Sequence, residues 1–227
     1  MECDIEQTGV LAALFRTPKD QRDEAWQSDF LTATPTASFA CRDPQVLVGP
    51  DGFPYFALYS PEPVQAFESF CIRNLASDFL LENGVGVAIN PGPDGVDWVF
   101  SYGDIVNWEL NGEFYSPAPK AQDPADEEPA SMLIAHPSET FLPLKTRHVL
   151  KSFLKEHGVA HPKVFLLTQT KELDILESLV FNLFEEDFET PDAFNNLMQR
   201  LTWFLPRHYY LTRVPNEPSW TTYFSNL

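Results

Sequence analysis

Paired histidines, glycine-rich turns and clustered acids are the parts of this sequence whose residue types could do chemistry. His157 and His161 lie four residues apart, so on a helix they would share one face and could bind a metal ion. Gly158 and Pro162 interrupt such a helix, and no third ligand lies close by in the sequence. We therefore interpret both histidines as solvated side chains at a helix end and a turn, and we expect no metal site.

A second candidate is the glycine pair in Gly84-Val85-Gly86, which begins like a dinucleotide-binding loop. Ile89 stands where the pattern G-x-G-x-x-G requires glycine. The expected order of elements also differs, because these glycines lead from a helix into a strand, whereas a phosphate-binding loop leads from a strand onto a helix N-terminus. The sequence contains neither a G-x-x-x-x-G-K-[ST] loop nor a G-x-S-x-G motif. We expect no cofactor and assign no catalytic residue.

Three acids near one turn, Asp94, Asp97 and Asp104, do not have the spacing of a calcium-binding loop. We interpret them as solvated turn acids. An enzyme is the alternative that the sequence leaves open, and it would have to assemble its site between two halves of the chain from side chains such as Asp104, His148 and His208. We expect a protein that is not an enzyme.

The cysteines and the apolar stretches bear on location. Cys3, Cys41 and Cys71 are odd in number and widely spaced, with no C-x-x-C, so we expect three reduced cysteines, with Cys71 buried in a strand. No apolar stretch approaches the roughly 20 residues that a membrane-spanning helix needs. The first residues lack the basic and apolar regions of a secretory signal. We expect a cytoplasmic protein that does not cross a membrane.

Charge is distributed unevenly along the chain, whose formal net charge is −18. Residues 1–116 hold 18 acidic and 5 basic side chains, a net of −13, whereas residues 141–227 hold 10 and 9. Non-specific nucleic-acid binding is excluded because it needs clustered lysine and arginine. The acidic front half favours a basic protein partner, although solubility alone would also account for it.

Aromatic and basic side chains supply the candidate binding residues. Aromatics crowd before a proline-rich segment, where they could line a ligand or partner surface or pack between the two halves. A basic strip recurs every four residues opposite the apolar stripe of a helix, and it is either a solvated face or a docking strip for the front half or an acidic partner. The candidates are Trp98, Tyr102, Asp104, Trp108, Tyr115, Arg147, Lys151 and Lys155.

The elements that must position these side chains fall into two domains, residues 1–116 and 141–227. Residues 117–140 include Pro117, Pro119, Pro124 and Pro129 among alanines and acids, which is typical of an extended connector. Within it, Met132 to Ala135 could form a strand on either half. We expect an α/β (α+β) fold of two small mixed-sheet domains with helices packed on the sheets.

Hydrophobic periodicity and turn residues predict the elements of each domain. In the front half these are a helix over 5–15, a hairpin of 46–48 and 53–59, a short helix from Ser60 to about Phe67, a strand over 69–72, a helix from Asn74 to Asn83, strands over 85–89 and 98–100, and a helix from Ser101 through Trp108. In the back half they are helices over 145–157, 173–184 and from Thr190 to Leu201, with strands over 163–168 and 208–214.

This order resembles the SseB, or enhanced serine sensitivity, family. The front half carries the similar stretches Asp51-Gly-Phe-Pro-Tyr-Phe-Ala-Leu-Tyr-Ser60, Gly84-Val-Gly-Val-Ala-Ile-Asn-Pro91 and Tyr102-Gly-Asp-Ile105. The back half is similar to the family's C-terminal domain in the helix from Leu142, the strand at 164–167, two further helices and a final strand after Pro206. The resemblance implies a two-domain cytoplasmic bacterial protein of poorly defined role, and it supplies no catalytic residue.

Our leading hypothesis is a non-enzymatic binding or regulatory protein acting through protein–protein contacts. A special case is an immunity or chaperone-like protein that neutralises a basic partner, whose binding would weaken with salt. A small-molecule sensor that binds an amino acid is suggested by the family name alone. The oligomeric state and the identity of the partner are left open by the sequence.

Overall fold

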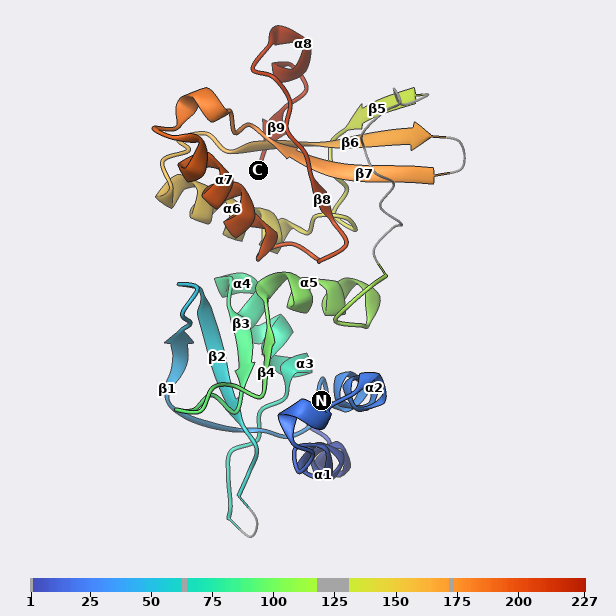
Figure 1. Ribbon diagram of the computed structural model, residues 1–227, viewed down its shortest axis with the longest axis vertical. Helices are drawn as coiled ribbons and strands as arrows, with labels where there is room; N and C mark the ends of the chain where they lie inside the picture. Colours follow the sequence, from blue (N-terminus) through green and yellow to red (C-terminus); the bar gives the residue numbers. More distant parts are fainter. Residues whose placement is uncertain (1, 63–64, 118–130, 172–173) are drawn as a thin grey trace. The chain divides into compact units, whose positions relative to one another are not determined.

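The computed structural model describes residues 2–62, 65–117, 131–171 and 174–227. The chain divides into two compact units, Met1–Phe114 and Tyr115–Leu227. Each unit has its own mixed sheet with helices packed on it (Figure 1), which confirms the predicted α+β class. Most of the predicted connector, at residues 118–130, lies outside the described residues, and its last part forms a strand of the second unit.

Unit 1 contains a sheet in the order β1-β2-β3-β4, formed by Ala40–Val48, Pro54–Tyr59, Gly86–Ile89 and Trp98–Phe100. The central pair β2 and β3 is parallel, and the two outer pairs are antiparallel. The predicted hairpin of β1 and β2 is confirmed, and its turn places Gly52 at a φ of 81°, which favours glycine. The β3 strand is buried along its whole length.

The helices of unit 1 begin with α1 (Ile5–Leu14) and α2 (Glu24–Ala33), which are capped by the side chains of Asp4 and Asp23, and the short helix η1 (Lys19–Gln21) lies between them. The predicted helix from Asn74 is a continuous run of α3 (Ile72–Leu75), the π-helical turn η2 (Ala76–Leu80) and α4 (Leu81–Asn83). It ends, as predicted, at Gly84 in the left-handed conformation. The last helix, α5 (Tyr102–Asn111), has the predicted Ser101 cap.

Two predicted elements between Ser60 and Ile72 are wrong. The described residues among 60–67 form no helix, because side chains such as those of Gln65 and Ala66 are exposed, and so short a helix is unstable without a buried face. The predicted strand over 69–72 reduces to a single bridge between Phe70 and Phe39, and Ile72 already opens α3.

Unit 2 contains a sheet in the order β5-β6-β7-β8, formed by Ser131–Ala135, Lys163–Lys171, Asp174–Phe181 and Tyr210–Leu211. The short strand β9 (Ser225–Asn226) also pairs with β6, beyond the end of β5. The pairs of β6 with β5, β7 and β9 are antiparallel, whereas β8 is parallel to β7. The predicted final strand over 208–214 is therefore confirmed only at its centre.

Strand β7 replaces the predicted helix over 173–184. Apolar residues in this segment do follow helical spacing, but Leu179, Val180 and Phe181 form a continuous buried run. Such a run fits a strand covered on both faces as well as a helix, so periodicity could not decide between them. The segment is a strand, because it pairs with β6 in antiparallel register from Asp174 to Phe181. Because this segment is a strand, one of the two further helices in the resemblance of the back half is absent.

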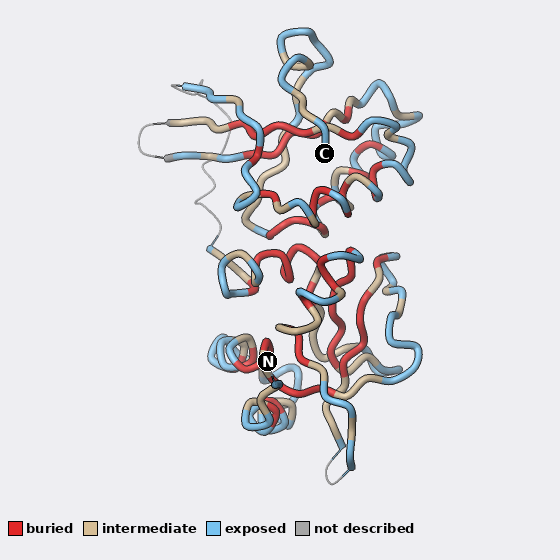
Figure 2. The backbone as a smooth tube through the Cα atoms, turned by 180° about the vertical axis from the view of Figure 1, so that it is seen from behind, coloured by how far each residue is buried: buried red, intermediate tan, exposed pale blue. Residues whose placement is uncertain are grey.

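The helices of unit 2 are α6 (Leu144–Glu156), η3 (Glu185–Asp187), α7 (Pro191–Thr202) and α8 (Pro218–Thr221). The predicted Thr190 cap and Pro191 start of α7 are confirmed. Figure 1 shows α6 and α7 along one face of the sheet, while Trp220 and Phe224 pack against Phe165. In Figure 2 the buried segments run through the strands and the inner sides of the helices of each unit. Of the helices within the described ranges, none is long and apolar enough to cross a membrane.

Candidate functional site

Two candidate binding residues, Tyr102 and Asp104, are fully buried in unit 1. The Tyr102 hydroxyl donates to the carbonyl oxygen of Leu81 at 3.0 Å, which ties α5 to α4. The Asp104 carboxylate accepts from the Ser101 backbone N–H at 2.9 Å, and the Ser101 hydroxyl accepts from the Asp104 N–H, so the two residues form a capping box. The predictions that Tyr102 and Asp104 contact a partner, and that Asp104 is solvated, are wrong because both side chains are inaccessible.

Each of the remaining aromatic candidates contacts aromatic or basic side chains of its own unit. Trp98 is half-buried in a cluster with the rings of Phe30 and Trp26, at centroid distances of 5.0 and 6.0 Å. The ring centre of Trp108 lies 6.3 Å from that of Phe114, which is itself buried against Phe100. In unit 2, the Arg207 guanidinium lies 4.1 Å from the centre of the Tyr115 ring. Trp98 and Trp108 therefore contribute mainly to the core of unit 1.

The predicted basic strip on α6 is not a set of three solvated side chains. Arg147 is buried, which lowers the pKa of its guanidinium, and its Nε donates to the carbonyl oxygen of Leu142 at 2.8 Å. Its other nitrogens contact the Pro137 carbonyl oxygen and the His136 ring. Arg147 therefore fastens the segment between β5 and α6, and the prediction that it faces a partner is wrong.

The other two basic candidates differ in exposure. Lys151 is half-buried and its ammonium donates to the backbone oxygen of Leu227 at 2.8 Å, whereas Lys155 is exposed. Among the residues proposed for an enzyme site, His148 is exposed on α6 and His208 packs against the Tyr209 ring. No group of three or more histidine, cysteine, aspartate or glutamate side chains is placed to hold a metal ion within the described part of the chain.

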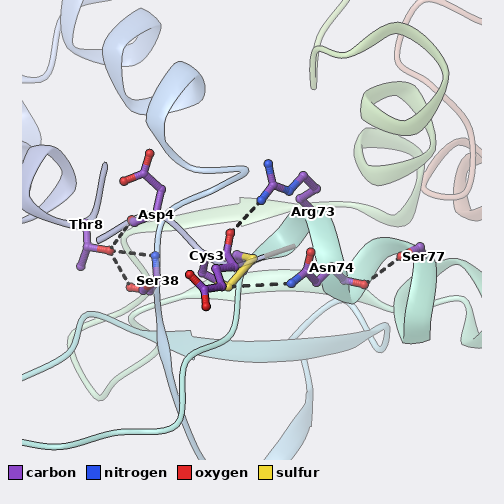
Figure 3. The surroundings of a disulfide bond; sticks show 9 residues. Cys3, Asp4, Thr8, Ser38, Arg73, Asn74 and Ser77 are labelled. Carbon is purple, nitrogen blue, oxygen red and sulfur yellow. Dashed lines mark hydrogen bonds between the residues drawn. A yellow bond between two sulfur atoms is a disulfide. The ribbon is translucent and has the colours of Figure 1, made fainter. Parts of the chain in front are cut away.

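Cys3 and Cys71 form a disulfide, so the prediction of three reduced cysteines is wrong. They are 68 positions apart, and only the fold brings them together, at a Cα–Cα distance of 5.7 Å. Figure 3 shows the bond beside two other ties of the same segment, which are the Arg73 guanidinium donating to the Glu2 carbonyl oxygen and Thr8 bonded to Ser38. The disulfide thus fixes the start of α1 to the start of α3.

The third cysteine, Cys41, carries a free and half-buried thiol. Burial is the main cause that raises the pKa of this thiol, so the reactive thiolate is disfavoured. We therefore assign Cys41 no nucleophilic role.

A polar network that the sequence analysis missed lies at the carboxyl ends of the parallel strands β2 and β3. Asn90 has a left-handed backbone (φ 50°), and its side-chain oxygen accepts from the Ser60 N–H at 2.7 Å. Its amide nitrogen donates to the Ser60 hydroxyl and to the Asp97 carboxylate, which pairs with Arg22 at 2.9 Å. Asp97 is thus paired, contrary to its interpretation as a solvated acid. The signal in the sequence was Asn90-Pro91-Gly92, a turn that favours a left-handed residue.

The strand β5 lacks the features that protect the other edge strands of the two sheets. Four of its five residues are exposed, among them Met132 and Leu133 with 52% and 65% of their surface exposed. Strand β1 carries Pro44 and a bulge, and β4, β8 and β9 have only three, two and two residues, which are ordinary protections for a sheet edge. None of these protections is present in β5.

The acidic side chains of the front half lie on its surface. Fifteen of the 18 acidic residues in 1–116 are exposed, and the exceptions are Asp4, Asp97 and Asp104. Among the bases, Arg22 pairs with Asp97 and Arg42 pairs with Glu62 at 3.6 Å. Five bases cannot neutralise this surface.

Comparisons of the chain with protein-family models, with curated proteins and with solved structures found no match. The resemblance to the SseB family therefore stays a prediction.

Proposed function

We propose that this protein is a non-enzymatic binding protein of the SseB-like kind, which acts through contact with a basic protein partner. The observation that carries the proposal is the exposed acidic surface of residues 1–116, with a net charge of −13. A surface of one sign attracts an oppositely charged macromolecule over roughly one Debye length, about 10 Å at 0.1 M salt, and raises its rate of association.

The roles of the buried polar groups are consistent with binding rather than catalysis. Asp104 caps a helix, and Arg147 holds backbone carbonyl oxygens. Asn90 and Asp97 bond to each other and to neighbouring groups. A catalytic acid or base must reach a substrate proton, and each of these groups is already engaged in holding the fold.

Affinity capture of the tagged full chain from a lysate of its native cell tests the proposal, with the eluate identified by mass spectrometry. The capture is run at about 50 mM and about 500 mM salt, between which the Debye length falls from about 14 to about 4 Å. We expect proteins of net positive charge to be enriched at low salt and lost at high salt. A tagged unrelated protein of similar negative charge is the control, and equal enrichment on that control would contradict the proposal.

A further inference from the structure

We propose that the free edge of β5 is the docking site for an extended segment of the basic partner, which adds to the sheet of unit 2 as a further strand. This inference rests on the proposed function for the charge of the partner. The site itself is argued from the geometry of unit 2.

The backbone of β5 has one free side among the described strands. Its five residues pair with β6 in a regular antiparallel register, from Ser131 opposite Thr170 to Ala135 opposite Leu166. The sheet order begins with β5, so no described strand pairs with its other side. In such a strand, alternate residues direct their N–H and C=O groups away from the paired neighbour, where an added strand can bond to them.

The side chains of β5 and its neighbours present apolar surface on both faces at this end of the sheet. Leu133 and Ile175 lie on one face, with 65% and 62% of their surface exposed, and Met132 lies on the other. In Figures 1 and 2, β5 and the adjoining ends of β6 and β7 extend past α6 and α7, so neither helix covers them. An added strand would therefore cover apolar side chains as well as backbone groups.

The negative charge near this edge favours a basic segment over a second copy of the chain. Residues 117–140, which include β5, hold five acidic side chains and one basic side chain, so a second copy would bring a like net charge of −4 to this edge, and like charges oppose association. Glu177 is exposed on the same face as Leu133, in the row Leu133–Thr168–Glu177. A strand that alternates basic with β-branched residues complements both the acidic chain and the apolar edge.

Fluorescence anisotropy with two labelled synthetic peptides of about ten residues tests the proposal on the full chain. One peptide alternates lysine with valine, and the other alternates lysine with proline, so the two carry the same charge but only the first can pair as a strand. We expect the lysine–valine peptide to bind at least about tenfold more tightly. Equal affinities, or no binding of the lysine–valine peptide, would overturn docking at an edge.

Two double variants then locate the binding. Met132→Lys with Leu133→Lys places charges on β5, whereas Ile5→Lys with Val48→Lys makes the same charge change at side chains of unit 1 that are 64% and 76% exposed. We expect the β5 variant to lose at least about tenfold in affinity and the unit 1 variant less than about threefold. Equal losses would overturn the β5 site.

Two further outcomes separate this inference from the proposed function. If the native partner is captured equally by the wild type and the β5 variant, the docking site is wrong and the proposed function stands. If no basic partner is captured by either chain, the proposed function fails. A wild type that is dimeric by sedimentation, and that Met132→Lys with Leu133→Lys makes monomeric, would show that the occupant is a second copy and would overturn a basic partner at this edge.

Discussion

Asn90 carries several structural roles in unit 1 at once. Its left-handed backbone turns the chain after β3, and its side chain joins β2 to the loop that leads into β4. A left-handed backbone costs most residues other than glycine roughly 1 kcal/mol or more, and asparagine is among the few that tolerate it. Asn90 therefore supports the stability of unit 1 more than its half-exposed position suggests.

We predict that Asn90→Ala lowers the free energy of unfolding by about 2 kcal/mol, because alanine loses the hydrogen bonds and disfavours the left-handed backbone. Asn90→Gly keeps that backbone accessible and should cost only about 1 kcal/mol. Urea unfolding followed by tryptophan fluorescence measures both variants. An alanine variant as stable as the glycine variant would show that the backbone conformation contributes nothing.

Tyr209 should make the stability of unit 2 depend on pH in the alkaline range. Its hydroxyl donates to the Phe141 carbonyl oxygen at 2.6 Å, and burial raises the pKa of Tyr209 to about 12. An unfolded tyrosine loses its proton near pH 10. The contribution of Tyr209 to stability is therefore complete below about pH 10 and is lost as the pH rises towards 12.

We predict that the free energy of unfolding of the wild type falls by about 1 to 2 kcal/mol more than that of Tyr209→Phe between pH 10 and 12, after allowance for partial exposure of the ring. Phenylalanine keeps the ring packed against Phe141, whose centroid is 4.2 Å away, but it cannot ionise. Denaturant unfolding across this pH range measures the difference. If the free energy of unfolding fell equally with pH in the two proteins, the role given to Tyr209 would be contradicted.

Among the helices and strands, the ends of helices could be predicted from the sequence, whereas one choice between helix and strand could not. Helix ends that depend on local chemistry were predicted well, including the Ser101 cap, the Thr190-Pro191 start and the Gly84 end. Strand β7 was predicted as a helix because its apolar spacing fits both structures, and only pairing with β6 distinguishes them. Local rules decide where a helix stops, whereas distant partners decide between a helix and a strand.

The candidate site was predicted less well, for the same reason. The sequence showed that Arg147 shares a helix with Lys151, but burial of its guanidinium depends on carbonyl oxygens of Pro137 and Leu142. Strand β5 appeared only as a short apolar piece within the connector, and its exposed edge depends on which strand it pairs with. The charge of the front half, in contrast, could be counted directly from the sequence.

The Cys3–Cys71 disulfide acts on elements by tying α1 to α3. Closing 68 residues into a loop restricts the unfolded chain, and the loop-entropy relation gives a stabilisation of about 4 kcal/mol. We predict that Cys3→Ser destabilises unit 1 by about this amount and that a thiol reductant has the same effect on the wild type. Thermal unfolding with and without reductant measures both, and a wild type insensitive to reductant, with its disulfide shown reduced by mass spectrometry, would contradict the prediction.

At the scale of the whole molecule, unequal charge should make the two units respond differently to salt. Self-repulsion within residues 1–116, at −13, destabilises unit 1, whereas residues 141–227 are nearly neutral. We predict that raising sodium chloride from about 10 to about 200 mM raises the melting temperature of unit 1 by a few degrees and changes that of unit 2 less, because the Debye length shortens from about 30 to about 7 Å. Calorimetry of the full chain measures both transitions.

The Cys3→Ser variant identifies which transition belongs to unit 1, because the disulfide lies wholly within that unit. A salt response confined to the other transition would show that the acidic surface does not repel itself. It would also weaken the proposal that this surface attracts a basic partner.

Hydrogen exchange of the full chain with and without its captured basic partner tests the central claim most directly. The outward amide groups of Ser131–Ala135 have no described backbone partner, so they should exchange rapidly in the free chain. If a basic partner adds a strand at this edge, exchange at β5 slows by at least about tenfold in the complex. A stable complex in which β5 exchanges as fast as in the free chain would contradict the account.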